Sequence, residues 1–149
     1  TIIVMFTIGL LYTNSLLDFD GDKVSHKKTL CSRFQDKDKA VSGLGIIYGC
    51  AYGLLVYAVA SKHFAPIFLI VFFTVPFVVE LMVSLLLFNE NKGYIPKKKL
   101  WHFPFEGFEK IKQRDESIAS FRFRMYQARN LMIYASVLVC VAKILSVYF

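Results

Sequence analysis

Four long apolar stretches alternate with polar segments along this chain of 149 residues. They cover residues 1–17, 40–61, 64–88 and 130–149. A helix needs about 20 apolar residues to cross a hydrocarbon layer of ~30 Å, so the last three stretches are long enough to span a membrane. We expect the first to be the later part of another span. The pattern therefore predicts an all-α fold, a polytopic transmembrane helical bundle.

Features within the spans refine this prediction. The connection at residues 62–66 is so short that the spans on either side should be antiparallel neighbours. Pro76 should kink its helix, because proline removes a backbone hydrogen bond. Glu80 lies at membrane depth, where a carboxylate is costly unless it faces the bundle interior or water. We expect it either to line a cavity, to bond to a helix outside this chain, or to reach the interface.

The longest polar stretch, residues 89–129, mixes basic and aromatic residues. Its first part includes Trp101 and His102 among lysines, a composition typical of a lipid headgroup interface. Apolar residues then recur at helical spacing between residues 106 and 126, which predicts an amphipathic helix on the membrane surface. Its basic residues should contact lipid headgroups, so the bilayer is an expected partner.

Composition and charge support a membrane protein. The hydrophobic share is 56%, and the mean hydropathy of +0.49 is too high for an ordinary soluble domain. The net charge of +7 does not point to nucleic acid, because six Lys/Arg lie in the loop at 18–39 and ten in the loop at 89–129. Two spans separate these loops, so both lie on one side, and the positive-inside rule makes it the cytoplasm. The three cysteines show no metal-binding spacing.

A polar motif follows the first apolar stretch. Asn14, Asp18 and Asp22 are four residues apart, so a helix places them on one face, whereas Asp20 points to another side. Two neighbouring carboxylates repel one another unless a cation lies between them. A Mg²⁺ ion bound by one or two carboxylates and completed by phosphate oxygens and water would hold them together. The basic residues that follow offer positive charge to a diphosphate: Lys23, Lys27 and Lys28.

Three other interpretations compete with the magnesium site. A calcium loop starting at Asp18 would need glycine and glutamate where Lys23 and Thr29 stand. A phosphatase of the haloacid-dehalogenase type, with Asp18 as nucleophile and Asp20 as acid/base, would need a soluble α/β domain downstream. The third interpretation is a solvated polar loop after a membrane helix. The histidines lack a second ligand at metal-binding spacing, although His26 could contact a substrate phosphate.

The motif also resembles a known family. Asn14-x-x-x-Asp18-x-x-x-Asp22-Lys23, followed by the run Lys27-Lys28-Thr29-Leu30, is similar to the second aspartate-rich motif of the UbiA superfamily of intramembrane prenyltransferases. The similarity is greatest to the menaquinone-pathway branch, the 1,4-dihydroxy-2-naphthoate polyprenyltransferases. Lys23 replaces the commoner arginine of that branch, and Ser25-His26 replaces a small residue and glycine.

The resemblance implies an activity and a set of site residues. The reaction would be transfer of a polyprenyl group from polyprenyl diphosphate to an aromatic acceptor, with Mg²⁺ as cofactor. Asp18 and Asp22 would hold the metal, and Asn14 would be a further ligand or would orient one. The diphosphate would be bound by Lys23, Lys27 and Lys28. Other branches, which make haem, chlorophyll or ubiquinone-type products, remain open, as does a non-catalytic membrane scaffold subunit.

The resemblance also implies an architecture. Such enzymes are bundles of about nine helices with two aspartate-rich motifs, and only the second is present here. We therefore expect this chain to correspond to the C-terminal half, with the N-terminal half of the same protein as its partner. On its own it should be inactive.

Overall fold

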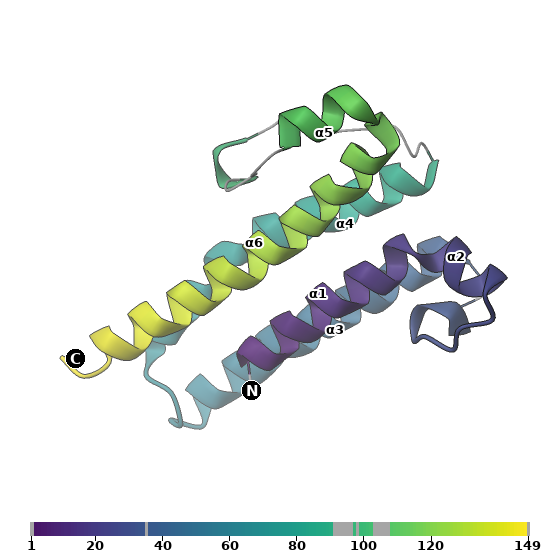
Figure 1. Ribbon diagram of the computed structural model, residues 1–149. Helices are drawn as coiled ribbons and strands as arrows, with labels where there is room; N and C mark the ends of the chain where they lie inside the picture. The colour runs from purple at the N-terminus through teal and green to yellow at the C-terminus, as the bar shows by residue number, and fades with distance from the viewer. Residues whose placement is uncertain (1, 35, 91–96, 98, 103–107, 149) are drawn as a thin grey trace.

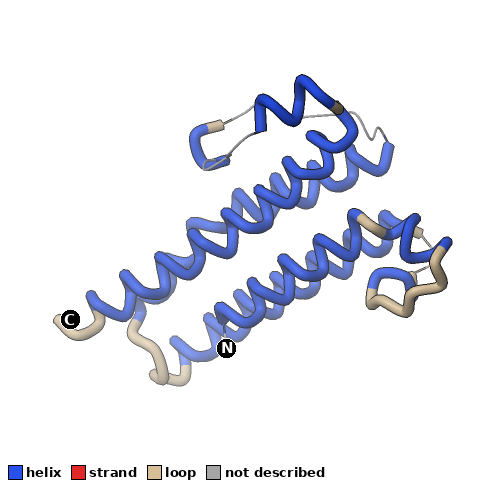
Figure 2. Tube along the Cα trace, viewed as in Figure 1, coloured by secondary structure: helices blue, strands red, loops and turns tan. Residues whose placement is uncertain are grey.

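The computed structural model describes residues 2–34, 36–90, 97, 99–102 and 108–148. These residues form helices connected by short turns, and no strand occurs among them (Figures 1 and 2). In chain order the elements are α1 (Ile2–Leu17), α2 (Phe19–Val24), η1 (Cys31–Arg33), α3 (Lys37–Ala60), η2 (Pro66–Thr74), α4 (Val75–Glu90), η3 (Leu100–His102), α5 (Phe108–Arg114) and α6 (Glu116–Leu145), where η marks a 3₁₀-helix.

Four antiparallel rods form the bundle: α1, α3, the η2–α4 pair and α6 (Figure 1). Helix α1 packs against both α3 and α6, while η2 and α4 pack against α3 and α6. Each rod therefore contacts two neighbours. One main core runs between them, and its fully buried side chains include Phe6, Leu44, Tyr48, Leu81 and Leu131.

Close helix contacts depend on glycine. A side chain at Gly9 would collide with the ring of Tyr48, and one at Gly43 would collide with the hydroxyl of Tyr12. That hydroxyl donates a hydrogen bond to the carbonyl oxygen of Ala40 at 2.8 Å, which joins α1 to the start of α3. Packing thus explains these glycines, because a small residue lets a neighbouring helix approach closely.

Among the residues that the structure describes, three helices are long and apolar enough to cross a membrane: Lys37–Ala60, Pro66–Glu90 and Glu116–Leu145. The prediction of an all-α fold with helices of spanning length is confirmed, and the structure is compatible with a membrane protein. Helix α1 has 16 residues and is about 24 Å long, shorter than the ~30 Å hydrocarbon layer. That it is the later part of a longer span stays a prediction, as does the bundle of about nine helices.

The predicted boundary between a surface helix at 106–126 and a span at 130–149 is wrong. Helix α5 ends at Arg114, and α6 runs without a break for 30 residues from Glu116. Residues 106 and 107 lie outside the described residues. The break occurs at Asp115, whose backbone is extended. Its carboxylate caps α6 by accepting hydrogen bonds from the backbone N–H groups of Ser117 and Ile118. The predicted loop at 89–129 therefore contributes the first half of α6.

The third apolar stretch changes from a 3₁₀-helix to an α-helix next to Pro76. Residues Pro66–Thr74 form a 3₁₀-helix, and the α-helix begins at Val75, one residue before Pro76. Proline is tolerated in the first turn of an α-helix, where its missing N–H is not needed. The hydroxyl of Thr74 bonds to the carbonyl of Val71 at 2.7 Å and to the hydroxyl of Tyr52 on α3 at 2.7 Å, which fixes the transition.

The two basic segments lie at the same end of the bundle. In Figure 1 α2 and the start of α3 lie at the end where α4 finishes and α6 begins, whereas the turn at residues 61–65 lies at the opposite end. A hydrogen bond of 3.0 Å from the Asn89 amide to the Asp38 carboxylate joins the two segments. Their placement on one side agrees with the sequence. That this side is the cytoplasm stays a prediction.

Candidate functional site

The aspartate motif lies on a nearly continuous helical path at the end of α1. The backbone N–H of Asp18 donates to the carbonyl of Asn14 at 3.2 Å, and that of Asp22 donates to the carbonyl of Asp18 at 2.8 Å. The helix relaxes only at Asp18, where α1 ends and α2 begins. These bonds preserve the four-residue spacing of the backbone from Asn14 through Asp18 to Asp22.

The three side chains of the motif differ in exposure. Asp18 is exposed, while Asp22 is buried, with 6% of its surface accessible. The Lys27 ammonium lies 3.9 Å from the Asp22 carboxylate, and its own side chain is 70% exposed. Asn14 is half-buried, but its Oδ1 atom is completely covered and has no hydrogen-bond partner in the described part of the chain. A covered oxygen without a partner costs free energy unless a ligand uses it.

Asp20 takes a different partner. It forms an ion pair with Lys37 at the start of α3. The expectation that Asp20 points away from the other two aspartates agrees with this contact. This ion pair joins α2 to α3, so the contact of Asp20 is separate from the other residues of the motif.

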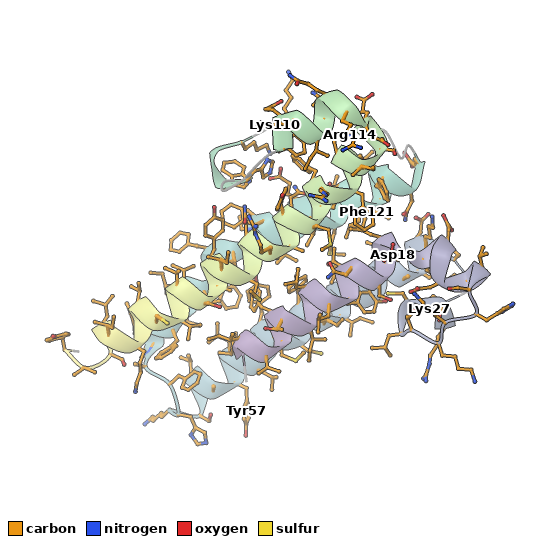
Figure 3. The ribbon with its side chains drawn as sticks, in the orientation of Figure 1. Asp18, Lys27, Tyr57, Lys110, Arg114 and Phe121 are labelled. Atoms are coloured by element: carbon orange, nitrogen blue, oxygen red, sulfur yellow. The ribbon has the colours of Figure 1, made fainter. Side chains whose placement is uncertain are left out.

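The three predicted diphosphate-binding lysines are all exposed. Lys23 lies over the ring of Phe19 at 4.3 Å from its centroid, and Lys27 approaches Asp22, as described above. Lys28 lies in the turn that follows. The structure brings together Asp22 and Lys27, and it spreads the other two lysines around the end of α2. Figure 3 shows Asp18 at the end of α1 and Lys27 farther out in the loop.

A tight turn closes the motif after α2. The backbone N–H of Lys27 returns to the carbonyl of Asp22 at 2.9 Å, and His26 adopts the left-handed conformation with a φ of 53°. Glycine is favoured at such a helix end because a side chain strains it. His26 thus occupies, in a glycine-type conformation, the position at which the resembled pattern has glycine.

The loop beyond this turn is anchored rather than loose. The Ser32 hydroxyl donates to the carbonyl of Lys27 at 3.0 Å and accepts from the backbone N–H of Thr29 at 2.9 Å. Cys31 is fully buried, and its thiol donates to the carbonyl of Tyr12 at 3.6 Å. Burial raises the pKa of this thiol, which keeps it protonated and suited to packing. The loop therefore holds the lysines close to the end of α1.

The donor atoms of the motif fit Mg²⁺ in kind. This ion is bound in proteins by one or two carboxylates, with other oxygens from substrate phosphates and water. Asp18 and Asp22 supply the carboxylates, and the partnerless Oδ1 of Asn14 supplies an amide oxygen. No cluster of three or more His, Cys, Asp or Glu side chains occurs in the described ranges. The motif therefore supplies three candidate ligand side chains, two carboxylates and one amide.

A second polar cluster lies on the other pair of rods. The carboxylate of Glu80 on α4 accepts from the Trp101 indole at 2.9 Å and lies 2.8 Å from the His102 Nε2 atom and 3.2 Å from the Lys99 ammonium. Of the three expectations for Glu80, bonding to a helix outside this chain is not needed, because its partners lie within the chain, and Glu80 lines a small cavity. The cavity beside it is only about 10 Å³, room for no more than one water molecule.

The hydrogen bonds define the state of His102. The backbone N–H of Lys99 donates to its Nδ1 atom at 3.1 Å, so the neutral ring carries its proton on Nε2 and donates to Glu80. Burial lowers the pKa of His102, although the Glu80 carboxylate opposes part of this effect. One signal in the sequence could have indicated this contact. A carboxylate in an apolar helix needs hydrogen-bond donors, and Trp101 and His102 are donors in the polar segment that follows.

The sequence did not predict that Arg124 is buried. It lies in the part of α6 that was predicted to be a surface helix, yet its side chain is completely covered. Its guanidinium donates to the carbonyl of Ser84 on α4 at 2.9 Å and to the carbonyl and hydroxyl of Ser120 at 2.7 Å. It also lies over the ring of Phe88 at 4.6 Å. This arginine joins α4 to α6 near their polar ends.

The fold and the motif together define a helical protein with three helices of spanning length and a pair of carboxylates at one end of its bundle. Comparisons with protein-family models, with curated proteins and with solved structures found no match.

Proposed function

We propose that this chain supplies the diphosphate-binding half of a Mg²⁺-dependent prenyltransferase, which moves a polyprenyl group from its diphosphate to an aromatic acceptor. The observation that carries the proposal is the four-residue helical spacing of Asn14, Asp18 and Asp22 at the end of an apolar bundle. It is supported by the covered, partnerless oxygen of Asn14 and by the lysine beside Asp22. The resemblance to the UbiA superfamily gives the reaction class.

The chemistry follows from the charges. The difficult step is departure of diphosphate from the allylic carbon, because negative charge builds up on the leaving oxygen. Asp18, Asp22 and Asn14 would hold Mg²⁺, which supplies Lewis-acid stabilisation of that charge when it is bound. Lys27 and Lys28 would pair with phosphate oxygens, and Lys23 would add positive charge nearby. The apolar helices would surround the isoprenoid chain and exclude water from the allylic cation.

The proposed acceptor is 1,4-dihydroxy-2-naphthoate, the substrate of the menaquinone-type branch, to which the motif is most similar. We further propose that the N-terminal half of the same protein completes the site and that this chain alone does not turn over. Adding a separately produced N-terminal half should restore activity. Full restoration by a half that lacks an aspartate-rich motif would contradict the two-motif arrangement.

The decisive experiment measures transfer from a radiolabelled prenyl diphosphate by the full-length protein in membranes. Asp18→Asn and Asp22→Asn should each lower Mg²⁺-dependent turnover by about 100-fold or more, because each removes charge from the metal site. Asp20→Asn is the matched control, since its carboxylate pairs with Lys37 instead. It should retain most of the activity.

Two results would overturn the proposal. Equal losses for all three aspartates would show that the motif acts only through general charge. A full-length protein with no turnover on any of several aromatic acceptors, including the dihydroxynaphthoate, would instead indicate a membrane scaffold. Offering these acceptors together with one labelled diphosphate also identifies the branch.

A further inference from the structure

A basic groove lies between α5 and the first two turns of α6, away from the aspartate motif. It has a volume of about 470 Å³ and is lined by Lys110, Ile111, Arg114, Asp115, Ile118 and Arg122. The three cationic side chains are exposed, and 48% of the Ile118 surface is accessible. Figure 3 shows Lys110 and Arg114 on α5, beside the beginning of α6.

Within the described residues, the cations of this groove have no carboxylate partner. Among the described residues, none of Lys110, Arg114 and Arg122 forms an ion pair or a side-chain hydrogen bond. Elsewhere in the bundle, by contrast, Lys37 and Lys99 each have a carboxylate partner. Three neighbouring positive charges around one groove repel one another, so an anion between them would be attracted by all three.

Asp115 is the acidic member of the groove, and its carboxylate is already engaged. Its Oδ1 atom accepts from the backbone N–H groups of Ser117 and Ile118 at 2.9 and 3.2 Å and from the Ser117 hydroxyl at 2.8 Å. These bonds lower the pKa of Asp115, so it stays ionised and caps α6. The lining of the groove therefore keeps a positive balance of two charges.

An apolar groove adjoins the basic one across Ile118. It has a volume of about 280 Å³ and is lined by Phe88 at the end of α4 and by Ser117, Ile118 and Phe121 on α6. Since Ile118 belongs to both grooves, a ligand could place an anionic head among the cations and an apolar chain along Phe88 and Phe121. This combination of a charged head and an apolar chain is the chemistry of a phospholipid.

The length of α6 places these grooves at headgroup level. Thirty residues make a helix of about 45 Å, whereas the hydrocarbon layer is ~30 Å thick. The last part of α6 carries a single charged residue, Lys143, so the charged first part, with Arg122, is the part that stands outside the hydrocarbon. Phosphate groups of the bilayer lie at that depth.

We propose that the groove between α5 and α6 binds the phosphate of an anionic phospholipid through Lys110, Arg114 and Arg122. One acyl chain of this lipid follows Ile118, Phe88 and Phe121. The site holds α5 against the membrane surface and is separate from the aspartate motif. The proposal does not depend on the prenyl-transfer activity.

The test uses the full chain in bilayers of phosphatidylcholine that contain brominated dioleoyl phosphatidylglycerol, which quenches nearby tryptophan. Phe121→Trp introduces an indole in the apolar groove, and the parent protein, with Trp101 as its single tryptophan, provides the background. The added fluorescence should be quenched severalfold more effectively by brominated phosphatidylglycerol than by brominated phosphatidylcholine. Each basic residue near an anionic surface contributes about a fivefold preference.

Charge removal then tests the site itself. Adding Lys110→Gln and Arg122→Gln should remove most of the preference for phosphatidylglycerol, because two of the three cations are lost. Quenching by brominated phosphatidylcholine should stay unchanged, which shows that the reporter remains in the bilayer. The matched control removes two exposed charges from the other basic segment at the same end, Arg33→Gln with Lys39→Gln. It should leave the preference intact.

Three outcomes would overturn the proposal. Equal quenching by the two brominated lipids would show no selectivity for the anionic head. An equal loss of preference in the control variant would show a general surface charge effect. Full displacement of the brominated phosphatidylglycerol by micromolar farnesyl diphosphate would show that the groove belongs to a prenyl diphosphate instead.

Discussion

The cluster around Glu80 and the aspartate motif are both polar sites in an apolar bundle, but they use their polar atoms differently. Glu80 is bonded to three groups from one short segment, Lys99, Trp101 and His102. In the aspartate motif Asp18 is exposed and the Oδ1 of Asn14 has no partner in the described residues. A satisfied network holds a segment in place, whereas donors and acceptors left open in a fixed arrangement are suited to a ligand.

The largest effect should come from breaking the satisfied network. Glu80→Leu should lower the free energy of unfolding by about 3 kcal/mol, because it leaves His102 and Lys99 without their acceptor. Glu80→Gln keeps a carbonyl oxygen for Trp101 and should cost only about 1 kcal/mol. Unfolding in detergent micelles, followed by circular dichroism, measures both. Equal stability of the two variants would show that the carboxylate charge does not hold the segment.

A substitution in the aspartate motif should raise the free energy of unfolding instead of lowering it. Asn14→Leu has nearly the same volume and removes the covered oxygen that has no partner, so we expect stability to rise by about 1 kcal/mol. Turnover of the full-length protein should fall at the same time. Asn89→Leu is the control, because its amide is bonded to Asp38 and its loss should destabilise slightly. A destabilised Asn14→Leu variant would mean that this oxygen is already satisfied.

Acid should loosen the satisfied cluster gradually. Burial lowers the pKa of His102 below its ordinary value of 6.5, so the unfolded or detached segment binds a proton more readily than the docked one. The contribution of His102 to docking is therefore complete above pH 6.5 and is lost as the pH falls toward the lowered pKa. The fluorescence of Trp101 should shift to the red between pH 7 and pH 5.

The pH response has a direct control. His102→Gln keeps an N–H donor for Glu80 but cannot titrate, so its Trp101 emission should stay constant over the same range. A shift of equal size in this variant would assign the response to another group, of which Glu80 and Lys99 are the charged ones in contact with His102.

The smallest effects on stability should come from the two exposed aspartates of the motif, Asp18 and Asp20. Asp18→Asn should change the free energy of unfolding by less than about 0.5 kcal/mol, because the side chain is exposed. Asp20→Asn, which loses the pair with Lys37, should cost as much or slightly more. Unfolding in micelles should therefore show the smaller loss of stability for Asp18→Asn, the variant that is expected to show the larger loss of turnover. A strongly destabilised Asp18→Asn variant would assign this carboxylate a structural role.

The hydrophobic pattern predicted the helices well because spanning length and apolar content are local properties of the chain. It failed where a short-range polar contact decided the outcome. Asp115 divides the polar segment into α5 and α6 through its hydrogen bonds to Ser117 and Ile118. The spacing of apolar residues in this segment does not indicate that break. An aspartate followed by Glu116 and Ser117 was nevertheless a readable helix start.

The candidate site was predictable in spacing and unpredictable in exposure. Four-residue steps placed Asn14, Asp18 and Asp22 on one helical path, which the backbone hydrogen bonds preserve. That Asp22 would be covered while Asp18 stayed exposed depends on how α2 and its loop fold back, which local spacing does not encode. The burial of Arg124 likewise depends on its contact with Ser84, 40 positions away in the chain.

The 3₁₀-helix of Pro66–Thr74 has a mechanical consequence. Its nine residues rise about 2.0 Å each instead of 1.5 Å, so the 25 residues from Pro66 to Glu90 reach about 42 Å, close to the ~45 Å of their neighbour α6. Rewinding these nine residues into an α-helix would shorten this rod by about 4 to 5 Å. The length of this rod therefore depends on the helix type of its first nine residues.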